Sequence, residues 1–273
     1  MSLGPFDLTG GPFLILYIAF FVATVVAGLV IPRRLRPEGR RQRVTDVDQL
    51  AFLAGGKRRF ADALVSRLLA VRALAMNGKT FTIGARLPEL SQAERSVLAL
   101  SAPIKWRDIQ GTLFPYAEPL ERRMVAAGLL TSREENSNLR FWAMLPYAVL
   151  LMFGATKWVI GDLRERPIGY LTVLLVMTAV FALIRWLSID RRTEAGRKAL
   201  ADAQETSLRI KRAPTEPEVG LAVALFGTVV LAGSGWSDFH KLRTAGDGGG
   251  SCGSSDGGGG GGCGGGGCGG CGG

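Results

Sequence analysis

The chain has 273 residues and a formal net charge of +10, and 47% of its residues are hydrophobic. The apolar residues gather in blocks, which excludes a purely soluble protein and leaves room for one or two small soluble domains. The basic excess is compatible with nucleic acid or anionic lipid as a partner, but in a membrane protein it first marks cytoplasmic loops.

The first apolar block covers residues 12–31 and carries no charged side chain. About 20 apolar residues in a helix span the roughly 30 Å hydrocarbon core of a bilayer. The basic residues follow the block: Arg33, Arg34, Arg36, Arg40, Arg41 and Arg43. This order predicts an uncleaved anchor, with a short outer N-terminus over residues 1–11 and a cytoplasmic C-terminal flank. A signal peptide cleaved after Ala27 is the alternative.

Residues 32–140 are therefore expected to be cytoplasmic, and their pattern predicts a small α+β domain. Asp46 precedes a helical apolar pattern that Gly55-Gly56 interrupts, and a second helical pattern follows. Asn77-Gly78 lies between two short β-prone runs, which predicts a hairpin with a type I′ turn. Two helices and a hairpin form the outline of a winged helix.

The outline recurs further along the chain. Ser91 and Glu94 form a capping-box pattern, and helices are expected at residues 106–113 and 115–127. A second wing is expected over residues 129–142, with Glu134-Glu135 in its solvated loop. The prediction is a tandem winged-helix-like domain, and the alternative is one small helical domain with a hairpin.

A transmembrane helical hairpin is predicted next, with helices at residues 141–160 and 168–187 and an outer turn at residues 161–167. Each helix has one charged side chain, Lys157 or Arg185, within four residues of its end. Such long side chains can extend to the headgroups, and a functional intramembrane charge is the alternative. The protein is thus expected to be mainly α-helical, to cross the membrane three times, and to have a cytoplasmic C-terminus.

The segment 188–245 is expected to be cytoplasmic and helical. Residues 190–212 are charged and helix-prone, which predicts a solvated or membrane-lying helix. Residues 219–233 form an apolar run of 15, which is short for a membrane span. A helix packed on the soluble domain is favoured over a further crossing. The single histidine, His240, is expected to be an exposed loop residue.

The tail, residues 246–273, is dominated by glycine and contains all four cysteines. Such a composition buries too little apolar surface to offset its ordering entropy, so the tail is expected to be disordered. Four thiolates can form a tetrahedral zinc site, although the glycine spacers supply no scaffold for one. Zinc, a lipidated tail and a redox-sensitive tether are alternatives to a tail without a specific role. The candidate metal ligands are Cys252, Cys263, Cys268 and Cys271.

Catalytic patterns do not appear: the sequence has no Walker loop, no GxGxxG and no HExxH. A DNA-binding surface on the winged-helix-like part would use Lys57, Arg58, Arg59, Arg67 and Arg72. Attraction of this domain to the anionic inner leaflet is the favoured explanation of these charges. The expected function is that of a non-enzymatic inner-membrane scaffold that binds an unidentified protein partner as well as membrane lipids. A membrane-tethered DNA-binding regulator and a metal-binding protein are the alternatives.

The arrangement as a whole resembles an uncharacterised family of bacterial membrane proteins. The resemblance rests on the N-terminal anchor, the helix break at Leu53-Ala-Gly-Gly56, the membrane hairpin, the run Ala224-Leu-Phe-Gly227 and the Gly/Cys-rich end. It covers most of the chain, and it implies a bacterial membrane location but no activity, cofactor or catalytic residue.

Overall fold

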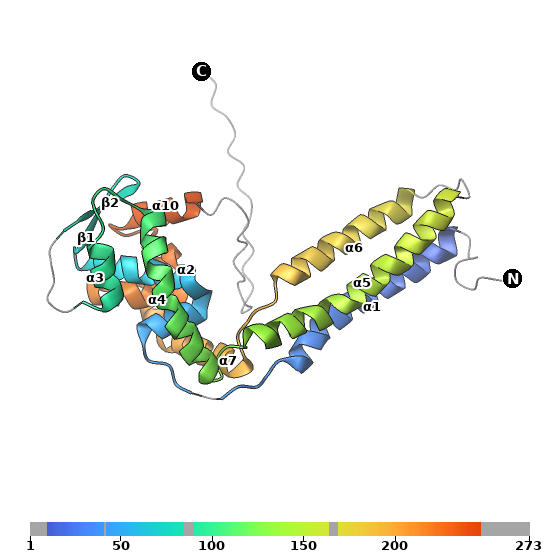
Figure 1. Ribbon diagram of the computed structural model, residues 1–273, viewed down its shortest axis with the longest axis horizontal. Coiled ribbons are helices and arrows are strands. Elements are labelled where there is room, and N and C mark those ends of the chain that lie inside the picture. The colour runs from blue at the N-terminus through green and yellow to red at the C-terminus, as the bar shows by residue number, and fades with distance from the viewer. Residues whose placement is uncertain (1–9, 41, 85–89, 164–168, 247–273) are drawn as a thin grey trace, which may run out of the picture.

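A computed structural model describes residues 10–40, 42–84, 90–163 and 169–246 of the chain. Three long helices lie beside one another at one end of the molecule, and a helical domain with a small sheet forms the other end (Figure 1). The long helices are α1 (Gly10–Leu35), α5 (Arg133–Leu163) and α6 (Gly169–Leu187). Each contains a segment long and apolar enough to cross a membrane, which confirms that helices of this length and composition lie where the three spans were predicted.

The helix α5 begins eight residues before the predicted span, at Arg133. The Ser132 hydroxyl accepts a hydrogen bond from the Glu135 backbone N–H (3.1 Å), and the Glu135 carboxylate accepts one from the Ser132 N–H (2.9 Å). This reciprocal capping starts the helix while the chain is still beside the soluble domain. The second wing predicted over residues 129–142 is therefore wrong, and Glu134 and Glu135 lie in a helical turn.

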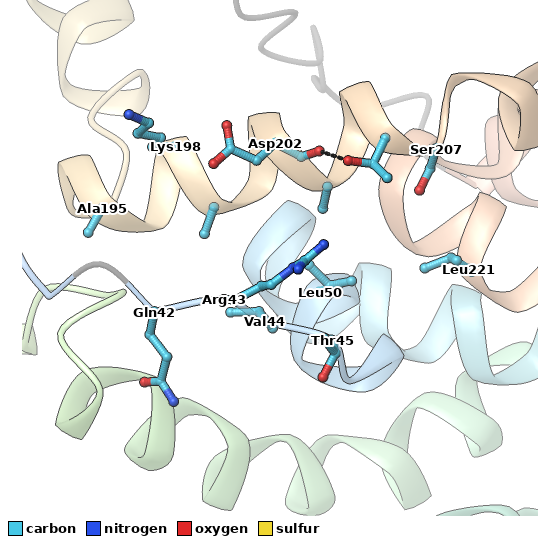
Figure 2. A pocket seen from close by; sticks show the side chains of 13 residues that line it. Gln42, Arg43, Val44, Thr45, Leu50, Ala195, Lys198, Asp202, Ser207 and Leu221 are labelled. Carbon is cyan, nitrogen blue, oxygen red and sulfur yellow. Dashed lines mark hydrogen bonds between the residues drawn. The ribbon is translucent and has the colours of Figure 1, made fainter.

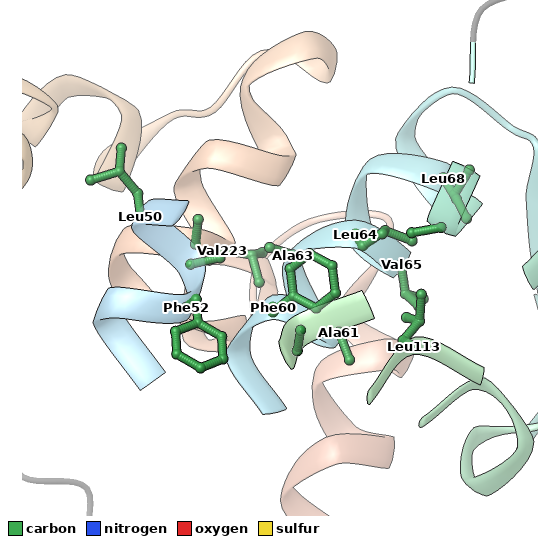
Figure 3. Close-up of a cluster of buried hydrophobic side chains, with 14 of the residues drawn as sticks. Leu50, Phe52, Phe60, Ala61, Ala63, Leu64, Val65, Leu68, Leu113 and Val223 are labelled. Atoms are coloured by element: carbon green, nitrogen blue, oxygen red, sulfur yellow. The ribbon is translucent and has the colours of Figure 1, made fainter. Parts of the chain in front are cut away.

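The soluble domain contains segments from both sides of the membrane hairpin. Its buried hydrophobic cluster extends from Leu50 to Phe239, so one core joins the two parts (Figure 3). The structure thus has one domain in place of tandem modules, and this domain is larger than the alternative expected within residues 32–140 because it includes residues that follow the hairpin. Its elements before the hairpin are α2 (Val47–Ala70), β1 (Leu74–Asn77), β2 (Thr80–Ile83), α3 (Gln92–Leu98), β3 (Ile104–Lys105) and α4 (Trp106–Ala126). Those after it are α7 (Glu194–Thr206), α8 (Leu208–Arg212), η2 (Glu216–Glu218), α9 (Val219–Phe226), η3 (Thr228–Leu231) and α10 (Ser237–Gly246).

At the centre of the domain, α2 packs against α9. Val219, Ala222 and Val223 of α9 are fully buried, and Val223 lies beside Phe60 and Ala63 of α2 (Figure 3). The first part of the apolar run that was too short for a membrane span is thus the buried helix α9, and η3 follows it, with Val229 exposed.

The predicted break in α2 is present at Gly55 and Gly56, whose backbone angles are not helical, and Gly56 has a φ of +66°. Arg192, which follows the membrane hairpin in the sequence, binds backbone carbonyls near this break. Arg192 donates from Nε to the Leu53 carbonyl (2.7 Å) and from Nη2 to the Ala54 carbonyl (2.5 Å). These two hydrogen bonds hold the segment after α6 against the kink of α2.

The sheet has the strand order β1-β2-β3, and the predicted hairpin joins its first two strands. Asn77 pairs with Thr80, so Gly78 and Lys79 are the loop residues, and Gly78 has a φ of +61°. A positive φ at the first loop position alone is typical of a type II′ turn, so the turn is shifted by one residue from the predicted type I′.

The two helices predicted over residues 106–127 form one helix, α4, with Pro115 and Pro119 inside it. A proline removes the N–H that would bond the carbonyl four residues earlier, here the carbonyls of Gly111 and Pro115. Both of these residues are exposed, so water can satisfy the carbonyls and the helix continues.

In the membrane bundle, α1 and α5 run antiparallel and interlock through two tyrosine–glycine contacts. A Cβ added to Gly154 of α5 would lie 2.8 Å from the Tyr17 ring of α1, and one added to Gly28 of α1 would lie 2.7 Å from the Tyr147 hydroxyl oxygen of α5. Each helix thus inserts a tyrosine where the other has no side chain. Close packing at small residues is the main source of helix association in a membrane.

The third helix, α6, adds a polar side chain at each of these two contacts. The Thr178 hydroxyl donates to the Leu174 carbonyl (2.8 Å), so it accepts from the Tyr17 hydroxyl (3.1 Å). Arg185 donates from Nε to the Gly28 carbonyl (2.9 Å). Arg185 is therefore bound to a neighbouring helix, whereas the sequence pattern predicted that its side chain extends to the headgroups.

Candidate functional site

Three short segments connect the membrane helices to the soluble domain, and backbone hydrogen bonds join them. These segments are here called the neck (residues 37–39, 128–131 and 190–195). After α6, the chain pairs with the segment before α5: the Thr193 N–H donates to the Leu129 carbonyl (3.1 Å), and the Thr131 N–H donates to the Arg191 carbonyl (2.8 Å). It also pairs with the segment after α1, because the Ala195 N–H donates to the Glu38 carbonyl (2.9 Å). The segment after α6 is thus bonded both to the segment before α5 and to the segment after α1.

The neck depends on glycines at points of close approach. Gly39 and Gly128 have φ values of +73° and +72°, in the left-handed region that favours glycine. A Cβ on Gly39 would lie 2.2 Å from the Gly128 carbonyl oxygen, and one on Gly196 would lie 2.1 Å from the Leu129 carbonyl oxygen. Side chains at these positions would separate the three segments.

A part-buried ion pair, in which the carboxylate is the buried partner, lies at the neck. The Glu121 carboxylate of α4 accepts a hydrogen bond from Arg191 Nη2 (2.8 Å), and Arg133 Nε lies 3.6 Å from the same oxygen. Burial raises the pKa of Glu121, but the hydrogen bond and charge of Arg191, with Arg133 and Lys57, outweigh it and hold the pKa below its ordinary value of 4.5. The carboxylate is therefore charged at neutral pH and holds the start of α5 and the end of the hairpin to α4.

Immediately beside the neck is a cleft of about 530 Å³. One wall is α7, whose Ala195, Ala199 and Ala203 line it at steps of four residues, and the other is the segment 42–45 together with Leu50 of α2 (Figure 2). This volume lies in the usual range for small-molecule sites. Other residues that line the cleft include Leu221, Thr206 and Ser207.

The cleft combines an apolar wall with charged groups. Arg43 lies inside it, between α7 and α2, whereas Lys198 and Asp202 lie on the outer side of α7 at its rim (Figure 2). Arg43 and Lys198 are exposed, and within the part of the chain that the structure describes neither forms an ion pair. This arrangement can bind an anionic group, but it does not contain a nucleophile paired with a base.

Several of the basic residues proposed for a DNA surface contact other groups of the domain. Arg67 Nε lies 2.7 Å from Glu94, Lys57 Nζ lies 3.6 Å from Glu118, and Arg59 donates to the Val223 carbonyl (3.3 Å). A surface that contacts phosphates needs free cationic groups. The structure therefore gives no observation that favours DNA binding.

The candidate metal ligands Cys252, Cys263, Cys268 and Cys271 lie outside the described residues, as does nearly all of the tail predicted to be disordered. Within residues 10–246, apart from the three internal gaps, no group of three or more His, Cys, Asp and Glu side chains could hold a metal ion. His240 was predicted to be a loop residue, and this prediction is wrong. The residue lies in α10, where its Nδ1 is 3.1 Å from the Thr228 hydroxyl.

Comparison with protein-family models, with curated proteins and with solved structures found no match. The resemblance to an uncharacterised bacterial family stays a prediction. The site is therefore defined by its geometry alone. Sequence analysis missed the cleft because it read Arg43 only as a marker of topology; the available signal was the four-residue spacing of alanines in α7.

Proposed function

We propose that the chain is a non-enzymatic scaffold of the bacterial inner membrane, with its soluble domain in the cytoplasm and a protein partner held at that domain. The ends of the three membrane helices next to this domain are rich in arginine, including Arg34, Arg36, Arg140 and Arg185. The turn at residues 161–167, at the other end of the hairpin, has two acidic and two basic residues. The positive-inside rule then favours a cytoplasmic domain.

The observation that carries the scaffold function is the neck. A domain that needs only to be anchored can hang on one flexible linker. Here three crossings are joined by hydrogen bonds, and one core spans residues on both sides of the hairpin. Such an attachment sets the orientation of the domain relative to the bundle. A fixed orientation is useful to a protein that presents a surface to a partner at the membrane.

The orientation is tested with single cysteines introduced into a chain whose four native cysteines are changed to serine. A cysteine at Ser137, in the exposed first turns of α5, is expected to react with an impermeant maleimide only after the cells are opened. A cysteine at Asp162, in the predicted outer turn, is expected to react in intact cells. The reverse pattern would place the domain outside and overturn the cytoplasmic scaffold.

The partner is tested by crosslinking in membranes, with a photoreactive amino acid at exposed domain positions such as Lys79 and Val229. One protein is expected to be captured in near-stoichiometric amount from the native chain. A variant that carries two flexible Gly/Ser inserts, one after Arg36 and one after Leu187, has a loosened neck. This variant is expected not to capture the protein. Failure to capture any protein from the native chain would contradict the scaffold, and equal capture by both chains would contradict the role of the neck.

A further inference from the structure

We propose that the cleft between α7 and residues 42–45 binds the phosphate headgroup of an anionic phospholipid from the adjoining leaflet. The shared chemistry of the ligand is a phosphate ester attached to an apolar body. The first argument is charge: Arg43 lies inside the cleft and Lys198 at its rim, both exposed. A guanidinium binds phosphate oxygens through paired N–H groups, and an ammonium acts beside it as a point charge.

The second argument is position. The N–H of Ala195, a residue that lines the cleft, is bonded to the carbonyl of Glu38, three residues after the end of α1. An extended chain advances at most about 3.6 Å per residue, so Glu38 lies within roughly 11 Å of the end of α1, and the Ala195 N–H lies 2.9 Å beyond the Glu38 carbonyl oxygen. The headgroup layer of one leaflet is half of the difference between the 40–45 Å bilayer and its roughly 30 Å core, about 5–8 Å, so this end of the cleft lies at or just beyond that layer.

The third argument is the lining. The alanines of α7 leave room along one wall, and Val44, Leu50 and Leu221 supply apolar surface behind Arg43. A free phosphate ion would leave this surface in contact with water. The glycerol and first methylene groups of a phospholipid would cover it. Asp202 at the rim disfavours a headgroup of high negative charge, so a phosphodiester with a single charge fits best.

The test uses the full chain in nanodiscs of phosphatidylcholine with a small fraction of photoreactive phosphatidylglycerol. Crosslinking is expected to saturate near one lipid per chain and to map to α7 or residues 42–45. The changes Arg43→Gln and Lys198→Gln are each expected to lower the apparent affinity about fivefold. Ala199→Phe, which fills the cleft without a change of charge, is expected to abolish the specific crosslink.

The matched control is Arg40→Gln, which removes the same charge from the same segment but from a residue that does not line the cleft. It is expected to leave the crosslink unchanged. An equal loss with Arg40→Gln would show diffuse attraction to the leaflet and overturn the site. Competition by millimolar glycerol phosphate or inorganic phosphate would assign the cleft to a soluble phosphate, and equal crosslinking of photoreactive phosphatidylcholine would exclude recognition of the charge. Either result would overturn the proposal.

Discussion

Arg185 Nε lies 2.9 Å from the carbonyl oxygen of Gly28, and Gly28 is the residue whose helical hydrogen bond Pro32 removes. In an α-helix, this carbonyl would accept from the N–H of residue 32, but proline has none. A carbonyl left unsatisfied in a bilayer costs several kcal/mol. The arginine of α6 therefore replaces a missing backbone donor in α1, and it holds the two helices together where Tyr147 of α5 also packs.

Replacement of Arg185 by methionine is expected to destabilise the bundle by about 1–2 kcal/mol, because the Gly28 carbonyl loses its donor. The change Pro32→Ala restores an N–H at position 32 and is expected to recover much of this loss in the double variant. Unfolding of the full chain in lipid discs, followed for the wild type, both single variants and the double variant, measures the coupling between the two positions.

If the changes in unfolding free energy caused by Arg185→Met and by Pro32→Ala simply add in the double variant, this relationship is contradicted. Additivity would show that Arg185 stabilises the bundle through its charge or its packing and not through the Gly28 carbonyl.

The two tyrosine–glycine contacts predict that Gly154→Leu separates α1 from α5. A Cβ at this position already lies 2.8 Å from both the Tyr17 ring and the Leu175 side chain, so a larger side chain must displace one of them. Overpacking of this kind costs about 1–3 kcal/mol. The control is Gly11→Leu, because a Cβ on Gly11 has no atom within 4 Å. Crosslinking between cysteines placed in α1 and α5 reports the separation, and equal effects of the two substitutions would refute the contact.

The membrane spans were predictable because length and apolar composition alone determine them. The helix break at Gly55-Gly56, the Asp46 cap and the hairpin were predictable because each depends on a few adjacent residues. The single discontinuous domain was not predictable in this way. Its core joins α2 to α9 across the membrane hairpin, and such a contact leaves no local pattern beyond an apolar run.

Likewise, the cleft and the neck depend on where distant segments meet. Gly39, Gly128 and Gly196 are ordinary glycines in the sequence, and only their approach to carbonyls of other segments gives them a role. The prediction of a second wing was wrong for a local reason. The polar residues 132–138 look like a loop, but the Ser132–Glu135 capping box begins a helix there, and the pattern was recognised at Ser91–Glu94 but not at this second position.

The ion pair at the neck predicts a dependence of stability on pH. The pKa of Glu121 is lower in the folded chain than its ordinary 4.5, so its contribution is complete above pH 4.5 and is lost as the pH falls through the folded value. Glu121→Gln is expected to lower stability by about 1–2 kcal/mol at pH 7 and by much less near pH 3.

Thermal unfolding of both chains at the two pH values measures this difference. The matched control is Glu118→Gln, because Glu118 is exposed and lies 3.6 Å from Lys57, an arrangement worth less than about 1 kcal/mol. A difference between wild type and Glu121→Gln that stays constant down to pH 3 would contradict the charged pair.

The discontinuous core predicts which fragment of the chain folds without a membrane. Residues 44–131 joined to residues 189–246 retain α2 and α9, and Leu130 and Arg192 already form an antiparallel bridge, so a short Gly/Ser linker suffices. This chain is expected to unfold cooperatively and to give a dispersed amide NMR spectrum. Residues 44–139 alone are expected to give neither, because the face of α2 that α9 covers would be exposed to water.

The role of α9 is isolated by one buried and one exposed substitution in the joined fragment. Val223→Asp places an unpaired carboxylate among Phe60 and Ala63 and is expected to prevent folding, whereas Val229→Asp, at a residue that is 59% exposed, is expected to leave the melting temperature nearly unchanged. A cooperative transition in residues 44–139 equal to that of the joined fragment would show that the first half is a domain by itself. The neck would then join two independent parts and would not close a single core.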